Sequence, residues 1–193
     1  MIQLSILIPA VFDRQSWDMY NYLRADIAGR PVEVLALFDD KHRSLGAKRN
    51  ALMSIAQGEY ITHLDDDDWF LHGYTDAVLG AIAANAGVDL IAYNNHSSLN
   101  GSPVFEVSTG LDYPNEQAHM VDGQWAAIKR KPWLWCCWRR ELVKSVLFPD
   151  KTCGEDWGWL EQVLPLVESC VKIEKVLHVY KYSNKSSVAD GRP

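Results

Sequence analysis

The sequence predicts an α/β fold, a single domain with a mainly parallel central sheet flanked by helices. Three observations predict it. Short apolar runs alternate with segments whose apolar residues recur at helical spacing, glycine or proline separates most of them, and aspartates follow two of the apolar runs. The chain has 193 residues, of which 48% are hydrophobic and 23% are charged, and this suits one domain with a sizeable core.

The first half of the chain, residues 1–94, shows the alternation most clearly. Strands are predicted over residues 4–10, 32–40, 59–64 and 88–94, and helices over residues 16–29, 46–58 and 75–87. Ligands of such sheets bind outside the carboxyl ends of the strands. The polar strand ends near Asp13, Asp39 and Asp65 are therefore expected to face one crevice.

The second half is less regular. Residues 95–117 are predicted to be loop-rich with one strand, residues 129–148 an aromatic strand followed by a short helix, residues 153–170 a helix opening at Gly154, and residues 171–188 a final strand with a polar tail. No repeat, low-complexity segment or linker interrupts the chain, so residues 1–193 are predicted to form one domain.

Composition and charge exclude several classes of protein. A formal net charge of -6 argues against non-specific coating of nucleic acid. No apolar run has the length of a membrane span, and the start of the sequence lacks the basic region and cleavage site of a signal peptide. The four cysteines form no C-x-x-C pair, which predicts reduced thiols in a cytoplasmic protein and no zinc site.

Four consecutive aspartates, Asp65 to Asp68, follow the third predicted strand. Two like charges about 4 Å apart repel by roughly 1 kcal/mol in water and by about 4 kcal/mol at an effective dielectric constant of 20. A divalent cation would offset this repulsion, because hard cations prefer carboxylate oxygens. A solvated acidic turn is the alternative, and the run alone does not separate the two.

Three other classes of phosphate-handling enzyme are excluded by pattern. A haloacid-dehalogenase phosphatase has D-x-D-x-[TV] after its first strand, whereas Trp69 occupies the Thr/Val place here and the strand is the third. The P-loop pattern G-x-x-x-x-G-K-[ST] is absent. Residues 9–15 contain no glycine, so the Gly-rich loop of sugar-nucleotide nucleotidyltransferases is absent as well.

Five stretches together resemble the inverting family 2 glycosyltransferases, which have a GT-A fold. They are residues 4–14 (LSILIPAVFDR), 34–40 (VLALFDD), 46–70 (ending in DDDDWF), 139–163 (containing GEDWGW) and 176–188. Their order and spacing match the family over nearly the whole chain. The resemblance implies a GT-A-like domain in which residues 1–94 bind a nucleotide sugar and residues 95–193 bind the acceptor and carry the catalytic base. It implies metal-dependent, inverting transfer of a sugar from a nucleotide donor, expected to be a UDP-sugar, to an acceptor hydroxyl, expected to be on a glycan.

The resemblance also implies which residues contact the donor and the metal ion. The nucleotide sugar is expected to contact Pro9, Ala10, Phe12, Arg14, Asp39, Asp40, Lys48, Asn50, Asp65 and Asp66. The cofactor is expected to be Mn²⁺ or Mg²⁺, with Asp67 as the first ligand and Asp65 as a ribose or second metal contact. No histidine follows Tyr180 and Lys181, where the family carries one, so a ligand role for His178 stays open.

Some of these residues also have a plain structural interpretation. Lys48 and Arg49 suit the exposed face of a helix, and Asn50 suits a residue that braces a loop. Asp156 is expected to be the general base that takes the proton from the acceptor hydroxyl. Glu155 and Asp156 in the first turn of a helix would also complement its macrodipole, by about 0.3–1 kcal/mol each.

The stretch KRKPWLWCCWRR, residues 129–140, is the candidate acceptor surface, with Glu155 beside it. Trp133 and Trp135 alternate, so they are predicted to share one face of a strand, whereas Trp138 points to the other. Three interpretations stay open: core packing, a platform for a sugar ring, and a nucleic-acid surface where bases stack between cations.

Two alternative functions follow from these features. A catalytically silent sugar-nucleotide-binding domain would keep the donor site without transfer. A DNA-base-modifying glycosyltransferase would have to expose its target base, and the negative net charge and the lack of a long basic stripe count against it. A glycan acceptor is therefore the first expectation.

Overall fold

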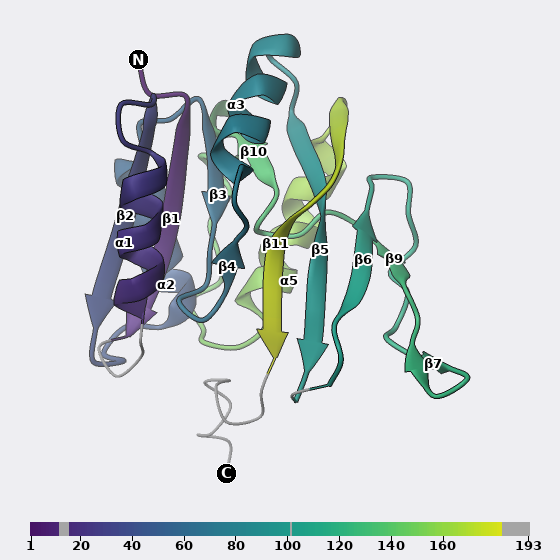
Figure 1. The fold of residues 1–193 in the computed structure, drawn as a ribbon. Helices are drawn as coiled ribbons and strands as arrows, with labels where there is room; N and C mark the ends of the chain where they lie inside the picture. The colour runs from purple at the N-terminus through teal and green to yellow at the C-terminus, as the bar shows by residue number, and fades with distance from the viewer. Residues whose placement is uncertain (12–15, 101, 183–193) are drawn as a thin grey trace.

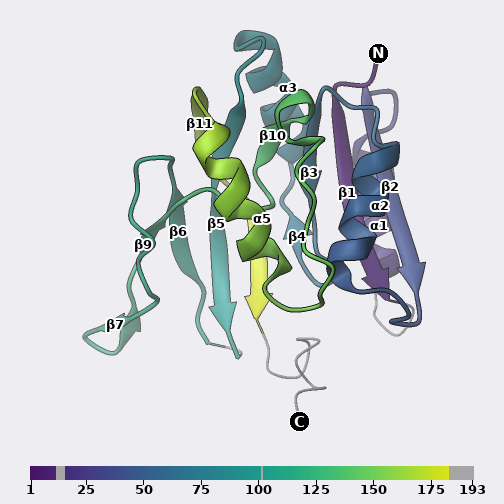
Figure 2. The ribbon, with the colours of Figure 1, turned by 180° about the vertical axis from the view of Figure 1, so that it is seen from behind.

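The structure is a computed structural model that describes residues 1–11, 16–100 and 102–182. Its main feature is one sheet with helices on both faces (Figures 1 and 2). The strands of this sheet are β1 (Leu4–Val11), β2 (Val32–Asp39), β3 (Tyr60–His63), β4 (Trp69–Phe70), β5 (Leu90–Leu99), β6 (Phe105–Thr109), β9 (Ile128–Arg130), β10 (Cys137–Arg139) and β11 (Cys170–Tyr182). No helix in the described part of the chain combines the length and apolar character that a membrane crossing requires.

The sheet is mixed. Its strand order is β2-β1-β3-β10-β5-β11-β4, with β6 added to β5 and β9 added to β6. Strands β1, β2, β3, β5 and β11 run in one direction, whereas β4, β6, β9 and β10 run in the other. The α/β class predicted from the sequence is therefore confirmed, but antiparallel strands contribute more than a mainly parallel sheet implies. The carboxyl ends of β1, β2, β5 and β11 lie at the lower edge in Figure 1.

Two apolar layers form the core, one on each face of the sheet. Helices α1 (Ser16–Asp26) and α3 (Tyr74–Ala84) cover one face, and helices α2 (Leu45–Ile55) and α5 (Glu155–Val163) cover the other (Figures 1 and 2). Alternate residues of β1 serve the two layers, since Ile6 and Ile8 pack with α1 and α3 while Leu7 packs with α2 and α5. The short helix α4 (Arg140–Val143) and the 3₁₀ turn Leu164–Leu166 complete the helical elements of the described residues.

The second half differs most from the sequence-based prediction. The aromatic strand predicted within residues 129–148 is interrupted, because residues 131–136 lie in an irregular segment between β9 and β10. Pro132 lacks the N–H that a strand ladder needs, and the Cys136 N–H closes a turn onto the Trp133 carbonyl oxygen at 3.0 Å. Trp133 and Trp135 nevertheless face the same side, as predicted, since both line the same cavity.

Polar residues predicted to form loops extend the sheet instead. Strand β5 continues through Asn95 to Leu99, where β6 and β11 flank it and satisfy its backbone groups on both sides. A separate hairpin joins β7 (Met120–Val121) to β8 (Gln124–Trp125) through Asp122 and Gly123, both with positive φ. Asp-Gly is a favoured pair for such a turn, so the sequence did contain a signal for this hairpin.

Helix α2 approaches the segment before α5 so closely that one position admits only glycine. A Cβ atom on Gly46 would overlap the carbonyl oxygen of Pro149, and the Gly46 N–H donates to the Lys151 carbonyl oxygen at 3.1 Å. Ser44 caps α2 by accepting from the Ala47 N–H at 3.0 Å. The start of α2 and the chain leading into α5 are therefore fixed to each other.

Gly46→Ala is expected to lower the free energy of unfolding by about 1–3 kcal/mol, because a backbone atom cannot give way as a side chain can. Gly80→Ala, at an exposed position of α3 with no atom near the added methyl group, is expected to raise it by roughly 0.5–1 kcal/mol. Urea denaturation measures both changes. Equal effects of the two substitutions would contradict the close packing of α2 on this segment.

Candidate functional site

The four consecutive aspartates have four different environments. Asp65 pairs with Arg49, and Asp66 is buried and accepts from the Val11 N–H at 2.9 Å. Asp67 is exposed, whereas Asp68 is buried and lies 3.1 Å from Nε2 of His178. Protein groups therefore offset much of the repulsion within the run. The solvated-turn interpretation describes at most one of the four carboxylates, Asp67.

The two cations of helix α2 point into the protein. Lys48 is 3% exposed and Arg49 is 1% exposed, so the alternative that placed them on an exposed helix face is wrong. Lys48 donates to the Ala10 carbonyl oxygen at 2.9 Å and to Oδ1 of Asp39 at 2.8 Å. These bonds tie α2 to the carboxyl ends of β1 and β2.

Asp39 closes the end of β2 with three hydrogen bonds. Besides Lys48, the backbone N–H groups of Lys41 and Arg43 donate to its carboxylate at 3.1 Å each. Burial alone would raise the pKa of Asp39, but these bonds and the Lys48 charge outweigh it, so the pKa is lowered. Asp39 is therefore held as an anion at the carboxyl edge of the sheet.

The remaining residues expected at the donor have varied positions. Pro9 and Ala10 are buried in β1, and Asp40 is exposed just beyond β2. Asn50 uses both ends of its amide on the backbone of Phe148, donating at 2.9 Å and accepting at 2.8 Å, so it braces that loop. Phe12 and Arg14, which were also expected to contact the donor, lie outside the described residues.

Arg49 connects the aspartate run to the helix expected to carry the base. Its Nη2 donates to Oδ1 of Asp65 at 2.7 Å, and its Nε donates to Oε1 of Glu155 at 3.4 Å. Burial raises the pKa of Glu155, and the Arg49 charge offsets part of that rise. Glu155 is 3% exposed, so it lies behind the site and not at the acceptor surface where the sequence analysis placed it.

Asp68 and His178 form a second buried pair, on the other side of the run. Burial raises the pKa of Asp68, and His178 offsets part of this. The His178 ring is fully buried and stacks on Trp135, with ring centroids 4.7 Å apart and planes 14° apart. His178 thus supports Trp135 and engages Asp68. Its Nε2 is directed at Asp68 and not at Asp67, the residue expected to hold a metal ion.

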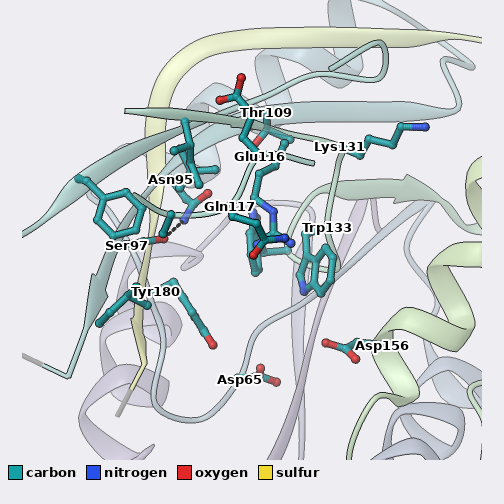
Figure 3. A pocket seen from close by; sticks show the side chains of 17 residues that line it. Asp65, Asn95, Ser97, Thr109, Glu116, Gln117, Lys131, Trp133, Asp156 and Tyr180 are labelled. Atoms are coloured by element: carbon teal, nitrogen blue, oxygen red, sulfur yellow. Dashed lines mark hydrogen bonds between the residues drawn. The ribbon is translucent and has the colours of Figure 1, made fainter. Parts of the chain in front are cut away.

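A cavity of about 360 Å³ lies between the end of β3, the outer strands and the start of α5 (Figure 3). Asp65 and Asp156 both line it, and Figure 3 shows their carboxyl groups at the same end, below Trp133. Asp156 accepts from the Trp157 N–H at 2.8 Å through Oδ1 and is half-buried. The fold therefore brings these two aspartates, which are distant in the sequence, to one cavity.

Aromatic side chains form another part of the cavity lining. Trp133 and Trp135 lie 6.0 Å apart between ring centroids, and Tyr180 stacks on Trp135 at 6.1 Å. The exposed Trp157 contacts the Trp133 ring edge-on at 4.7 Å. The core-packing interpretation fits Trp138, which is fully buried, whereas Trp133 and Trp135 are half-buried, pack against the core and also line the cavity.

Several cavity residues were not anticipated from the sequence. Asn95, Thr109 and Arg130 come from β5, β6 and β9, strands that the sequence-based prediction left partly or wholly undefined. Arg130 was noted only as one of several cations beside the tryptophans. The alternation of apolar Phe105 and Val107 with polar Glu106 and Ser108 was the available signal for a strand that presents alternate residues to a common side.

No group of three or more His, Cys, Asp or Glu side chains suited to a metal ion occurs among residues 1–11, 16–100 and 102–182. Asp65 and Asp67 are separated by one residue and stand at the carboxyl edge of the sheet. A cation held there would need further oxygen ligands from a bound molecule. This arrangement suits Mg²⁺ or Mn²⁺ with a diphosphate, because Mg²⁺ commonly takes one or two carboxylates and completes its shell with phosphate and water.

Comparison with known proteins identifies structures that share the fold of this chain, but no protein with a clearly related sequence. No protein-family model and no curated protein matches the chain. Crystal structures of TarS from S. aureus, a glycosyltransferase, do match it. TarS 1-349 in complex with UDP-GlcNAc has a TM-score of 0.65 at 12% identity over 100% of this chain and 62% of that chain. TarS 1-349 in complex with UDP has a TM-score of 0.61 at 13% identity over 94% and 61%.

A further TarS structure gives a TM-score of 0.64 at 12% identity and covers 94% of this chain. This chain spans only 37% of that TarS chain and about three fifths of the two shorter ones. At this level of identity the likeness concerns the fold alone. The chain therefore shares the α/β fold of TarS, and its activity has to be argued from its own site.

Arg49→Met is expected to lower the free energy of unfolding by about 3–5 kcal/mol at pH 7, because it leaves Glu155 as an unpaired buried charge. Burial raises the folded-state pKa of Glu155, so its contribution to stability is greatest below the unfolded pKa and is lost as pH rises through the folded pKa. The deficit relative to wild type should therefore shrink as pH falls from 7 to about 4.

Urea denaturation of both proteins at the two pH values tests this. Arg24→Met, the same substitution at an exposed position of α1, should change stability by no more than about 0.5 kcal/mol. A deficit for Arg49→Met that is small, or equal at both pH values, would show that Glu155 does not depend on Arg49.

Proposed function

We propose that this chain is a metal-dependent, inverting glycosyltransferase that moves a sugar from a nucleotide donor, a UDP-sugar, to an acceptor hydroxyl. One observation carries the proposal. Asp65, from the aspartate run, and Asp156, from the first turn of α5, line the same cavity although 91 positions separate them in the sequence. A single buried arginine braces the two segments that carry them.

The donor is proposed to lie along the carboxyl ends of β1, β2 and β3. Asp39 is held there as an anion, which suits an acceptor of hydrogen bonds from a base or a ribose. The fold supports this proposal, because TarS structures that share it contain UDP-GlcNAc and UDP. None of Asp39, Asp40 and Lys48 lines the cavity, so the donor nucleotide and the acceptor would occupy neighbouring, separate parts of the site.

Asp67 and Asp65 are proposed to hold the cation, Mn²⁺ or Mg²⁺, together with the diphosphate of the donor. When bound, the cation supplies positive charge that stabilises the leaving diphosphate. Asp67 is exposed at the protein surface, so it is accessible to a cation that arrives with the donor. The proposed first ligand is Asp67, as expected from the sequence.

Asp156 is proposed to be the general base. The acceptor oxygen would attack the anomeric carbon of the sugar while Asp156 takes its proton, and the bond from that carbon to the diphosphate would break. One displacement assisted by one base inverts the anomeric centre. Oδ1 of Asp156 accepts from its neighbouring backbone N–H, which fixes the carboxyl group and leaves Oδ2 without a hydrogen bond from the described residues.

A non-catalytic sugar-nucleotide-binding domain is the competing function, and slow release of UDP separates the two. Incubation of the protein with UDP-sugars and Mn²⁺ should release UDP even without an acceptor, because transferases commonly pass some donor to water. Binding of a UDP-sugar with no UDP release under any condition, including addition of hydroxylated acceptors, would favour the non-catalytic domain.

Asp67→Asn is expected to abolish the part of the UDP affinity that depends on Mn²⁺, because an amide replaces the charged metal ligand. Isothermal titration calorimetry with UDP, with and without Mn²⁺, measures it. Asp122→Asn is the matched control, at the exposed hairpin tip where asparagine tolerates the same positive φ. Metal-dependent affinity that survives in the Asp67 variant would remove this residue from the metal site.

Asp156→Asn is expected to slow sugar transfer by roughly 10²–10⁴-fold, the usual contribution of a general base, with little change in donor affinity. Glu161→Gln, on the exposed side of the same helix, should leave transfer unchanged. Both are measured as UDP formed per unit time with saturating donor. If Asp156→Asn slows transfer only a few-fold, Asp156 stabilises the start of α5 and is not the base.

A further inference from the structure

Arg130 and Lys131 are the two cations that line the cavity, and within the described residues neither forms an ion pair. Arg130, at the end of β9, lines the cavity together with Asp65 and Asp156. Its guanidinium lies over the ring of Trp133, with Cζ 5.0 Å from the ring centroid. No carboxylate of the described residues forms an ion pair with it, in contrast to Arg49 and Arg139, which are both paired.

The environment of Arg130 favours a bound anion. Burial lowers the pKa of Arg130, because water solvates the guanidinium poorly, and the electrostatic effects of Tyr180 and Asp156 only partly offset this. Its Nε is shielded from solvent and has no hydrogen-bond partner within the described residues. A partly desolvated cation of this kind is stabilised most by an anion that approaches from the open side of the cavity.

The neighbouring carboxylate is already engaged. Glu116 also lines the cavity, but its Oε2 accepts from the Lys129 N–H at 2.7 Å. The Arg130 carbonyl oxygen accepts from the Gly110 N–H at 3.1 Å, and the Lys131 N–H donates to Oδ1 of Asn115 at 3.0 Å. These bonds fix the backbone of β9 and of the segment after it, so the backbone position of Arg130 is well defined.

Other cavity residues have polar atoms suited to a hydroxylated ligand. Nε1 of Trp135 and Oδ1 of Asn95 are, like Nε of Arg130, shielded from solvent without a partner in the described part of the chain. Small side-chain movements would bring one hydrogen-bond donor and one acceptor to a bound molecule. A volume of about 360 Å³ is within the range of small-ligand pockets.

We infer that the cavity is an acceptor subsite for a hydroxylated molecule that carries an anionic group, a phosphate ester or a carboxylate, with the anion on Arg130 and the reacting hydroxyl at Asp156. This rests on the proposed function, because it names the acceptor class for the same site. The anion is assigned to the acceptor because Asp39 and Lys48, at the proposed nucleotide site, lie outside this cavity, and Asp65 is the one cavity residue that also belongs to the proposed metal site. The Trp133 ring lies beneath the guanidinium and stabilises a cation at this position.

Three ligands on one pyranose scaffold test the inference. Glucose 6-phosphate, glucuronate and glucose are titrated into the protein at fixed ionic strength, and binding is followed by calorimetry, with the total tryptophan fluorescence as a second readout. At least one of the two anions should bind ten times more tightly than glucose. The comparison of the phosphate with the carboxylate shows which anion the subsite prefers.

Arg130→Gln should weaken binding of the preferred anion roughly 10- to 100-fold, the range expected for a hydrogen bond to a charged group, and leave glucose unaffected. Arg130→Lys should retain part of the affinity, because it keeps the charge and loses the planar fork. Lys129→Gln is the control, since it removes the same charge from the adjacent residue, whose ammonium lies over Tyr113 and outside the cavity.

UDP is titrated into the same variants, so that failure of the subsite and failure of the proposed function are separated. Unchanged UDP affinity in Arg130→Gln, with loss of the anion, supports the inference. If no variant binds UDP but anion binding still requires Arg130, the proposed function is wrong, whereas the anion site is supported. A parallel loss of UDP affinity would make Arg130 a donor contact and would overturn the inference.

Two further results would also overturn it. One is equal binding of the anions by wild type and Arg130→Gln. The other is Arg130-dependent binding of a single-stranded oligothymidylate far more tightly than of either sugar anion, which would assign the cavity to a nucleic acid. In that case affinity should fall steeply with salt, with a log–log slope near −0.7 for each phosphate contacted.

Discussion

The buried guanidinium of Arg49 is the constraint on which the rest of the site depends. It lies between Asp65, which follows β3, and Glu155, which begins α5, and it is almost completely removed from water. A buried cation is costly unless it is paired, so the two carboxylates must approach it for the fold to be stable. Their approach brings the aspartate run and the first turn of α5 together. The proposed base, Asp156, is adjacent to Glu155 and reaches the cavity as a result.

The aspartate run combines structural and functional positions. Asp66 holds the end of β1, Asp68 engages His178 beneath Trp135, and Asp65 engages Arg49 at the cavity. Each carboxylate faces a different direction, and this divides the repulsion that four adjacent charges would otherwise generate. Asp67 is the most exposed of the four. A cation with a diphosphate is proposed for this exposed position and for Asp65, which lines the cavity.

Much of the fold could be predicted from the sequence, and the site only in outline. Periodicity defined the strands and helices of residues 1–94, because local patterns determine those elements. The burial of Lys48 and Arg49 could not be predicted, because helical spacing shows only that they are polar, and the partners of Arg49 lie 16 and 106 positions away. The extension of β5 to Leu99 depends on β6 and β11, which pair with it from later in the chain. Arg130, which forms no ion pair within the described residues, lies on β9, in that outer part of the sheet.

A double-mutant cycle between Arg49 and Glu155 tests most directly whether this pair holds the two halves of the site together. The variants are Arg49→Met, Glu155→Met and the combination of both, and urea denaturation at pH 7 gives their free energies of unfolding. The account predicts a coupling free energy of about 1–3 kcal/mol, with the double variant more stable than Arg49→Met, because the second substitution removes the charge that the first leaves unpaired. Effects that simply add would contradict the account, since they would show that Arg49 and Glu155 contribute to stability independently of each other.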